Sequence, residues 1–586
     1  MKAEKANTNI LDIKVLKGIY QFVAPYRLTF YSLIILTTIL SIVAVVRPLL
    51  IKLVLDKYLV QSKYDTFVWI TILMFVVILF QALFEYAMAY YSGLLAQNVI
   101  KDIRIQLFSH ILKFRLKFFD NTPVGRLITR TVSDLESVAE IFSEGLLAIA
   151  GDVLQIVILL GVMFYMDWKL TLISLSLLPI LFYSTYVFKE KVKVSFAEVR
   201  VAVANLNTFV QEHITGMSII QIFNAEKREQ NKFEKINQAH TDANKRSILY
   251  YSVYFPIAEV ISTACIALAV WYSGSQVLDG QLTLGTMLFF IMSINMFFRP
   301  IRMLADRFNT LQMGIVSADR VLSLIHDTSE VANDGDRKLE HVKGKVELKN
   351  VQFSYNPGDL VLKDISFKVA PGQTVALVGA TGAGKSSIIG LINRFYDIQL
   401  GEILIDDVSL YSLDMESLRK QIGVVQQDVF LFSSSIYDNI TLGDNSISKA
   451  RVMEVARMVG VDELINRLPG GLDYKVMERG NTLSVGQRQL ISFVRTMINN
   501  PKILILDEAT SSVDSDTEEL IQKAIATMMK GRTSIIIAHR LSTIKMADQI
   551  IVLEKGEIVE KGTHDELLST GNYYAKLHEM QYSSAV

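Results

Sequence analysis

The amino-terminal half of this 586-residue chain contains six apolar stretches that reach, or nearly reach, the length needed to cross a lipid bilayer. A helix of about 20 apolar residues is as long as the hydrocarbon core is thick. We therefore predict a membrane all-α domain of six helices within residues 1–325. The expected spans lie at about residues 28–50, 66–92, 143–166, 168–188, 248–272 and 282–304.

The connections between the expected spans differ in charge. Lysine and arginine number 5 before the first span, 7 between the second and third, and 10 between the fourth and fifth, whereas the alternate connections hold few. Because basic loops stay in the cytoplasm, both termini are expected there. The first 25 residues lack the basic, apolar and small-residue order of a cleavable signal peptide. The sequence thus predicts a multi-pass protein of the cell (inner) membrane.

Composition argues against several other functions. The 59 basic residues balance 59 acidic ones, so the chain has no excess positive charge with which to bind nucleic acid. The single cysteine, Cys265, excludes an intrachain disulfide and a cluster of cysteine ligands for a metal. Nucleic acid is therefore not an expected partner.

A second, soluble domain is expected over residues 344–586, after a polar linker at residues 326–343. Apolar runs such as those at 374–378 and 503–506 are typical of buried parallel strands, and helical stretches separate them. The sequence therefore predicts an α/β domain.

The sequence GATGAGKS, which begins at Gly379, matches the phosphate-binding P-loop between an expected strand and an expected helix. Gly379, Gly382 and Gly384 let backbone amides surround a phosphate at the positive end of the helix. Lys385 would contact the β- and γ-phosphates of a nucleotide, and the Ser386 hydroxyl would bind Mg²⁺. This motif indicates a nucleotide site, but it does not separate a transporter from a kinase or a GTPase.

Two acidic residues end the apolar run at 503–506. Asp507 and Glu508 follow an expected strand, and open α/β sheets bind their ligands at the carboxyl ends of strands. Asp507 suits the coordination of Mg²⁺, and Glu508 suits the general base that activates an attacking water. A nucleotide bound together with Mg²⁺ is therefore expected at this site.

A further motif, LSVGQ at residues 483–487, makes the prediction specific. It resembles the signature motif of the ATP-binding cassette (ABC) family. The resemblance implies that Ser484, Gly486 and Gln487 contact ATP held by a second subunit, so that a lone cassette cannot complete a site. The same residues could also be a plain helix start that Ser484 caps.

The resemblance extends to other positions of the cassette. It implies that Tyr355 stacks on adenine, that Gln427, or its neighbour Gln426, reaches Mg²⁺, and that His539 touches the γ-phosphate. Gln427 and His539 would act in catalysis with Glu508, whereas Tyr355 could instead be an ordinary surface tyrosine. The additional residues expected to bind the nucleotide are Thr381, Ser387 and, at the dimer interface, Asp514.

The helical pattern continues for tens of residues beyond the membrane in both long cytoplasmic connections. The turns at residues 118–127 and 223–229 resemble the coupling helices of ABC exporters, and residues 478–480 resemble the segment that contacts them. Either turn could also be an ordinary helix corner, and residues 478–480 could hold an exposed ion pair. The chain is thus expected to be a half-transporter that works as a dimer by alternating access.

The expected cargo is a hydrophobic or amphipathic drug, lipid or peptide, and membrane lipids are expected partners. An alternative is a membrane-anchored ATPase that regulates a partner without transport. Three charged residues, Arg47, Glu85 and Glu259, fall inside the expected spans. Such charges often mark a substrate path, but these could also pair with one another or reach the bilayer surface.

Valine occupies the third signature position, where the family pattern has glycine. Glycine accepts any backbone angle and a close phosphate, whereas Val485 is β-branched and bulky. A weakened signature beside an intact Glu508 and His539 resembles the competent subunit of a heterodimeric exporter. The second half-transporter is therefore expected to be a different chain, slightly ahead of a second copy of this one.

Overall fold

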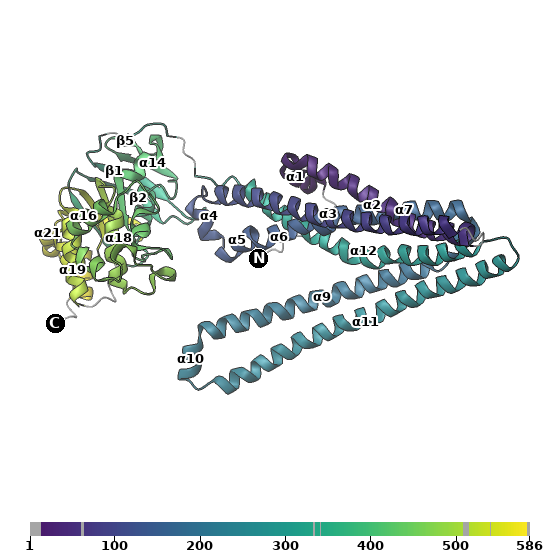
Figure 1. Cartoon of the computed structure of the whole chain (residues 1–586). Coiled ribbons are helices and arrows are strands. Elements are labelled where there is room, and N and C mark those ends of the chain that lie inside the picture. The colour runs from purple at the N-terminus through teal and green to yellow at the C-terminus, as the bar shows by residue number, and fades with distance from the viewer. Residues whose placement is uncertain are drawn as a thin grey trace. The chain divides into compact units, whose positions relative to one another are not determined.

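The computed structural model describes residues 13–59, 64–331, 335–339, 341–507, 515–538 and 541–582. They form two compact units (Figure 1). The first, the helical unit, contains the chain up to Leu112 together with Thr122–Thr328. The second, the cassette unit, contains Ser329–Val586 and also the short segment Lys113–Asn121, which lies far away in the sequence.

The helical unit contains the six predicted spans. The described residues include six helical segments that are long and apolar enough to cross a membrane: Lys14–Tyr58, Asp65–Ile111, Val124–Met166, Trp168–Thr215, Glu226–Leu278 and Leu284–Ile325. Their helices are α1 (Ile13–Val23), α2 (Arg27–Leu53), α3 (Tyr64–Ile111), α5 (Val124–Thr131), α6 (Ser133–Glu140), α7 (Leu146–Met166), α8 (Trp168–Ser174), α9 (Leu178–Thr215), α10 (Met217–Ile222), α11 (Glu226–Leu278) and α12 (Leu284–Ile325).

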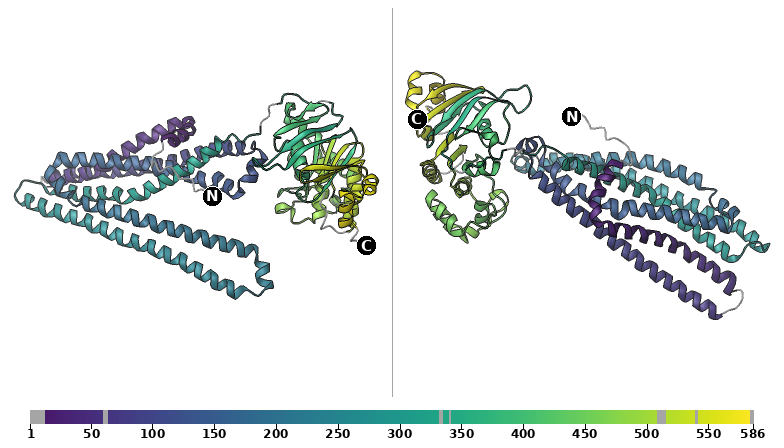
Figure 2. Two further views of the ribbon diagram at one scale, coloured as in Figure 1. Left: turned by 180° about the vertical axis from the view of Figure 1, so that it is seen from behind. Right: turned by 90° about the horizontal axis from the view of Figure 1, so that it is seen from above.

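Several of these helices are far longer than a bilayer requires. α3 has 48 residues and α11 has 53, which correspond to about 72 and 80 Å at 1.5 Å per residue. The hydrocarbon core is only about 30 Å thick, so the helical extensions expected from the sequence are present. α9 and α11 run side by side as a long hairpin that α10 closes (Figure 2).

The fourth span differs from its prediction as one helix over residues 168–188. It consists of α8 and α9, with residues 175–177 between them in a turn. Pro179 explains the break, because proline lacks the amide for a helical hydrogen bond and disfavours helix at the residue before it. At the other end, the Asp167 side chain caps α8 by accepting a 2.7 Å hydrogen bond from the Leu170 amide.

The cassette unit contains two sheets. A four-stranded sheet has the order β2-β1-β4-β5, and a six-stranded sheet has the order β10-β9-β3-β8-β7-β6. The strands are β1 (Val346–Phe353), β2 (Leu362–Val369), β3 (Thr374–Gly379), β4 (Leu400–Ile405), β5 (Val408–Ser409), β6 (Ile422–Val425), β7 (Ile503–Asp507), β8 (Thr533–Ile537), β9 (Gln549–Glu554) and β10 (Glu557–Gly562). The predicted α/β class is therefore confirmed.

The larger sheet is parallel from β9 to β6, and its central strands are buried, as their apolar runs indicated. The helices of this unit are α4 (Leu116–Asn121), α13 (Lys385–Ile392), α14 (Met415–Gln421), α15 (Ile436–Thr441), α16 (Lys449–Val459), α17 (Asp462–Arg467), α18 (Val485–Met497), α19 (Ser515–Met529), α20 (Leu541–Lys545), α21 (His564–Thr570) and α22 (Tyr573–Tyr582). α12 ends at Ile325 and β1 begins at Val346, so the expected linker at 326–343 lies between these two elements.

Candidate nucleotide-binding site

The P-loop joins β3 to α13 in a conformation that requires glycine. Gly382 and Gly384 have φ angles of 84° and 102°, in the left-handed region that side chains rarely enter. A Cβ atom on Gly384 would also lie 2.5 Å from Cδ2 of Leu362. The loop exposes Thr381, Gly382 and the Ser386 hydroxyl to solvent, so these groups are accessible to a phosphate.

Lys385 is the buried cation of the loop. Its side chain folds back over the P-loop, and Nζ donates hydrogen bonds of 2.7 Å to the Gly379 carbonyl and 3.0 Å to the Ala380 carbonyl. Burial lowers the pKa of Lys385, and the negative charge of Asp507 opposes that shift. A phosphate at the loop would therefore stabilise the charged form of this lysine.

The sheet register brings the acidic end of β7 to the same edge as the P-loop. β8 lies between β3 and β7, and both Leu377 and Asp507 are aligned with Ile537 of that strand. On the other side of β7, Val425 of β6 is aligned with Leu506, and the exposed Gln427 follows two residues later. Carboxyl ends of parallel strands thus gather the predicted residues Asp507 and Gln427 beside the loop.

These groups fit the chemistry of Mg²⁺. Ser386 offers a hydroxyl, Asp507 a carboxylate and Gln427 an amide oxygen, and all are the hard oxygen donors that Mg²⁺ prefers. The described residues contain no cluster of three or more His, Cys, Asp or Glu side chains that could hold a metal by themselves. Such a sparse donor set suits a cation that shares its coordination with nucleotide phosphates and water.

Three predicted residues lie outside the described residues. They are the expected general base Glu508, the interface residue Asp514 and the γ-phosphate contact His539. Glu508 directly follows Asp507 of β7, and His539 comes two residues after Ile537 of β8. Their roles therefore remain predictions from the sequence.

The predicted adenine-stacking residue, Tyr355, lies beside the P-loop helix. Its hydroxyl is 3.0 Å from the hydroxyl of Ser387, the second serine after the loop lysine. Its ring packs edge-on against Phe353 at a centroid distance of 4.8 Å and against Tyr396 at 5.1 Å. An aromatic face held next to the phosphate loop can stack on a nucleotide base.

The signature motif forms the amino terminus of α18. The Ser484 hydroxyl accepts a 3.2 Å hydrogen bond from the Gln487 amide, and the Ser484 amide donates 3.0 Å to the Gln487 side chain, which completes a capping box. The capping that was considered as an alternative to a functional role is thus present. It also leaves Ser484 exposed at the positive end of a 13-residue helix, next to the buried Gly486.

Val485 does not strain the backbone, contrary to one part of the sequence argument. It is the first residue of α18, and it is not among the described residues with positive φ. Glycine's conformational freedom is therefore not needed at this position. The bulk of valine still matters, because the Val485 side chain is 45% exposed at the helix end where a phosphate would approach.

Residues 478–480 turn sharply against α18. Arg479 and Gly480 have φ angles of 55° and 74°, and Arg488 donates a 3.4 Å hydrogen bond to the Gly480 carbonyl. Glu478 and Arg479 are exposed, and among the described residues neither forms an ion pair, which argues against the simple salt bridge considered above. The contact of this segment with the coupling helices remains a prediction from the sequence.

The first predicted coupling turn, residues 118–127, is divided: residues up to Asn121 belong to the cassette unit with the segment before them, and the rest belongs to the helical unit. The amide of Arg115 donates a 2.9 Å hydrogen bond to the Ser329 carbonyl, and its guanidinium pairs with Asp397. On α4, Asp120 accepts a 2.5 Å hydrogen bond from the Tyr396 hydroxyl. Burial and the Asp120 carboxylate raise the pKa of Tyr396, so the phenol keeps its proton and remains a donor.

Tyr396 and Asp397 could not be recognised as functional residues from the sequence. No motif includes them, and 276 residues separate Tyr396 from Asp120. Tyr396 also contacts Tyr355, which in turn reaches Ser387 of the P-loop helix. A continuous set of contacts therefore links α4 to the candidate nucleotide site.

We expect Tyr396→Phe to weaken coupling between α4 and this site. The substitution removes the only hydroxyl of the side chain and leaves the Asp120 carboxylate without a charge-assisted hydrogen bond, which contributes on the order of 1.5–3 kcal/mol. Transport per ATP hydrolysed should fall several-fold, while basal hydrolysis stays within about twofold. The measurement is the ratio of substrate uptake to phosphate release in proteoliposomes.

Tyr411→Phe is the matched control for that experiment. The Tyr411 hydroxyl accepts a 3.0 Å hydrogen bond from the Ile398 amide, and both residues belong to the cassette sequence rather than to α4. Equal uptake-to-hydrolysis ratios in the two variants would contradict a coupling role for Tyr396.

The second predicted coupling turn, residues 223–229, lies in the helical unit between the end of α10 at Ile222 and the first residues of α11, so the short helix precedes the predicted range. Ile222 and Phe223 are each 73% exposed there, and Ile219 is also exposed. Exposed apolar side chains at the end of a polar helical hairpin suit a contact with another protein surface.

The six spans and the nucleotide site together define a membrane-bound ATPase, and comparisons with known proteins agree. Residues 30–301 match the family model described as ABC transporter transmembrane region, and residues 362–511 match the one described as ABC transporter. A solved bacterial Atm1-family ABC exporter with ATP bound has a TM-score of 0.79 at 27% sequence identity, and the match covers 96% of this chain and 100% of that chain.

Curated relatives match along nearly their full length. The chain is 36% identical over 575 residues to the putative multidrug export ATP-binding/permease protein YgaD of Bacillus subtilis (strain 168), covering 97% of this chain and 99% of that protein. It is 35% identical over 534 residues to the ATP-dependent lipid A-core flippase of Syntrophus aciditrophicus (strain SB), covering 91% and 89%. The chain therefore belongs to the ABC transporter family, with the fold of an exporter half-transporter. Its cassette is an ATPase coupled to transmembrane transport.

Proposed function

We propose that this chain uses ATP to export a hydrophobic or amphipathic drug, lipid or peptide by alternating access, as one half of a dimer. The contact between α4 and the cassette supports the proposal most directly. Asp120 and Arg115 belong to the connection between two membrane spans, yet they bind Tyr396 and Asp397 near the P-loop. When ATP binding brings the two cassettes together, these contacts would transmit the movement to the membrane spans.

The roles proposed for the nucleotide site follow from its geometry. Lys385 and the P-loop amides would hold the phosphates, with Ser386, Asp507 and Gln427 as oxygen donors for Mg²⁺, the ion that supplies charge neutralisation at the phosphates. Glu508 would orient and deprotonate the attacking water. Ser484 would contact the ATP that the other half of the dimer binds.

The orientation proposed for the chain places both termini and the cassette in the cytoplasm of an inner membrane. The basic connections before the first, third and fifth spans support this topology. Exposed Trp168 and Trp271 lie near the opposite helix ends, which suits a bilayer interface there, while the orientation itself rests on the basic connections.

Transport is tested with inside-out proteoliposomes that expose the cassettes to added ATP. We expect ATP-dependent accumulation of amphipathic fluorescent compounds inside the vesicles, together with faster ATP hydrolysis in their presence. Hydrolysis that no drug, lipid or peptide accelerates, without any accumulation, would favour the membrane-anchored regulator instead.

The partner is proposed to be a second, different half-transporter, since the bulk of Val485 weakens the signature that this chain would offer to ATP on another subunit. The purified chain alone should then hydrolyse ATP slowly, and Val485→Gly should raise its activity several-fold. Glycine at the first helical position costs only about 0.5–1 kcal/mol relative to alanine, so the cassette should remain folded.

Val559→Gly is the control for this substitution. Val559 lies on β10 with a similar exposure, 43%, and the change should leave ATP hydrolysis unaltered. Rapid hydrolysis by the unsubstituted chain on its own would show instead that a homodimer is sufficient.

A further inference from the structure

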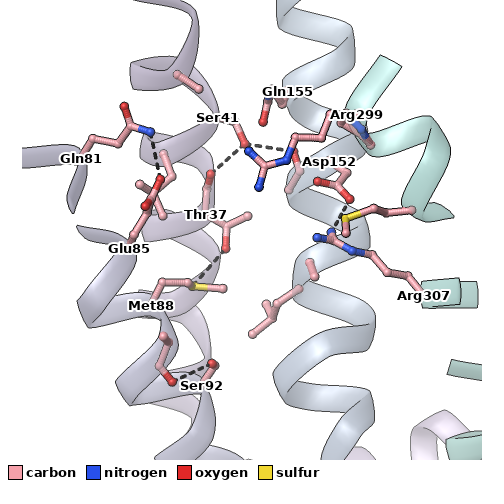
Figure 3. Close-up of a pocket in the computed structure, with 18 of the residues that line it drawn as sticks. Thr37, Ser41, Gln81, Glu85, Met88, Ser92, Asp152, Gln155, Arg299 and Arg307 are labelled. Atoms are coloured by element: carbon pink, nitrogen blue, oxygen red, sulfur yellow. Dashed lines mark hydrogen bonds and ion pairs between the residues drawn. The ribbon is translucent and has the colours of Figure 1, made fainter. Parts of the chain in front are cut away.

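A polar pocket of about 470 Å³ lies in the helical unit, lined by residues of α2, α3, α7 and α12 (Figure 3). Its charged lining consists of Arg47, Glu85, Asp152, Arg299 and Arg307. Four of these residues lie within the expected spans, and Arg307 lies three residues beyond the sixth span on the same helix, α12. Charges at such positions are costly unless water, a counter-ion or a ligand meets them, so the pocket is a candidate binding site.

Both carboxylates of the pocket are already engaged. Asp152 forms an ion pair with Arg307, and Figure 3 shows these two side chains facing each other. Glu85 accepts a 2.9 Å hydrogen bond from the Gln81 amide, one helical turn away. Three arginines against two carboxylates leave the pocket with an excess of positive charge, although the neutral Gln81 amide does not itself neutralise Glu85.

The remaining arginines are Arg47 and Arg299. Among the residues that the structure describes, neither forms an ion pair with a carboxylate or a hydrogen bond. Arg299 acts electrostatically on Asp152, but Arg307 already holds that carboxylate. Both guanidinium groups are exposed to the space of the pocket and its surroundings rather than packed among helices.

The pairing that the sequence left open is therefore absent from the described residues. Arg47, Glu85 and Glu259 do not pair with one another, because Glu259 is held by Arg302 and Glu85 by Gln81. Arg47 remains as an intramembrane cation that no described side chain neutralises.

The other part of the lining is apolar and adaptable. Met88, Met296 and Met303 contribute flexible, polarisable side chains, and Leu147 adds to them. Methionine adjusts its shape to irregular apolar groups. The pocket therefore combines an excess of guanidinium groups with a surface that suits a hydrocarbon or ring system.

We propose that this pocket binds the anionic head group of an amphipathic substrate, with Arg47 and Arg299 as the two donors. Guanidinium groups donate paired hydrogen bonds to the oxygens of a phosphate or a carboxylate, and low-dielectric surroundings strengthen that attraction. The inference rests on the export function proposed above, and it specifies the charge of the cargo.

The test uses the full-length protein in nanodiscs of neutral lipid, so that binding is measured apart from transport. The probes are fluorescent amphiphiles with one shared tail and a carboxylate, a neutral or a quaternary ammonium head, together with fluorescent phosphatidylglycerol and phosphatidylcholine of identical acyl chains. We expect the anionic member of at least one set to bind roughly tenfold more tightly than its neutral and cationic counterparts. If the anion is preferred only among the single-tail amphiphiles, the anionic ligand is a free amphiphile. If phosphatidylglycerol is preferred over phosphatidylcholine, the ligand is a lipid.

Arg47→Gln and Arg299→Gln should each weaken binding of the anion by roughly tenfold and leave the neutral probe unchanged. Arg47→Lys should retain part of the affinity, since it keeps the charge but not the paired donors. Arg246→Gln is the control, because Arg246 pairs with Glu198 on an exposed helix face outside the pocket. The midpoint of thermal unfolding of each variant, compared with that of the unsubstituted protein, reports whether it is folded.

Equal binding of all head groups, or an anion preference that survives in both glutamine variants, would overturn the inference. Uptake of the same probes into inside-out proteoliposomes tests the export function separately. Arginine-dependent binding without any uptake would support the anion site and contradict export, whereas efficient uptake of neutral or cationic probes alone would support export and contradict the anion site.

Discussion

Replacing Glu508 by glutamine is expected to reduce ATP hydrolysis by at least about 100-fold while ATP still binds, because a general base contributes about 10²–10⁴ to the rate. Glutamine keeps the size and hydrogen-bonding reach of the side chain but cannot accept the proton of the attacking water. Asp507, one residue earlier on β7, remains as the carboxylate beside Lys385. The nucleotide should therefore stay bound and hold the cassettes together.

Two measurements check this expectation. Phosphate release should fall in Glu508→Gln, while a fluorescent ATP analogue should bind with an affinity within a few-fold of the unsubstituted protein. Glu416→Gln is a suitable control, since Glu416 is exposed and pairs only locally with Lys420. Hydrolysis within a few-fold of the unsubstituted rate would mean that another group activates the water.

Local patterns predicted most of the fold. Long apolar stretches identified the six spans because a bilayer imposes a minimum length on any helix that crosses it. Short apolar runs identified the central strands because a parallel sheet buries both faces. The break between α8 and α9 was missed, although Pro179 is visible in the sequence, because hydropathy averages over the residues that break a helix.

Contacts between distant segments could not be predicted in the same way. The hydrogen bond between Tyr396 and Asp120 joins residues whose neighbours in the sequence carry no shared motif. It depends on how α4 packs with the cassette unit, which no local pattern records. That Arg47 and Arg299 line one pocket could not be predicted either, because the sequence shows each charge but not the helices around it.

Val485 allows the two reasons for glycine at this position to be separated. The sequence argument attributed the usual glycine to conformational freedom and to space. The capping box of α18 places residue 485 in ordinary helical geometry, so freedom of the backbone is irrelevant. The remaining reason for glycine at this position is space for the phosphate. Val485→Gly tests that reason alone, because the substitution removes the bulk of the side chain from an ordinary helical position.

Replacing Lys385 by alanine is expected to lower the affinity for ATP by about 10- to 100-fold, because hydrogen bonds to charged groups contribute on the order of 1.5–3 kcal/mol. Nζ now binds the carbonyls of Gly379 and Ala380, and it would exchange them for phosphate oxygens. The affinity is measured by titrating a fluorescent ATP analogue into the full-length protein. Lys420→Ala is the control: it removes a lysine that forms an exposed ion pair with Glu416, and it should leave the affinity for ATP unchanged.

Thermal unfolding separates this role from a purely structural one. ATP at 100 times its dissociation constant stabilises a protein by about 2.7 kcal/mol, which raises the midpoint of unfolding. If Lys385 binds phosphate, the stabilisation by the same ATP concentration should fall to about 0.4–1.4 kcal/mol in Lys385→Ala, so the variant should lose half or more of that increase. If the lysine only holds the P-loop together through Gly379 and Ala380, the variant should unfold at a lower temperature without ATP yet gain the full increase when ATP is added.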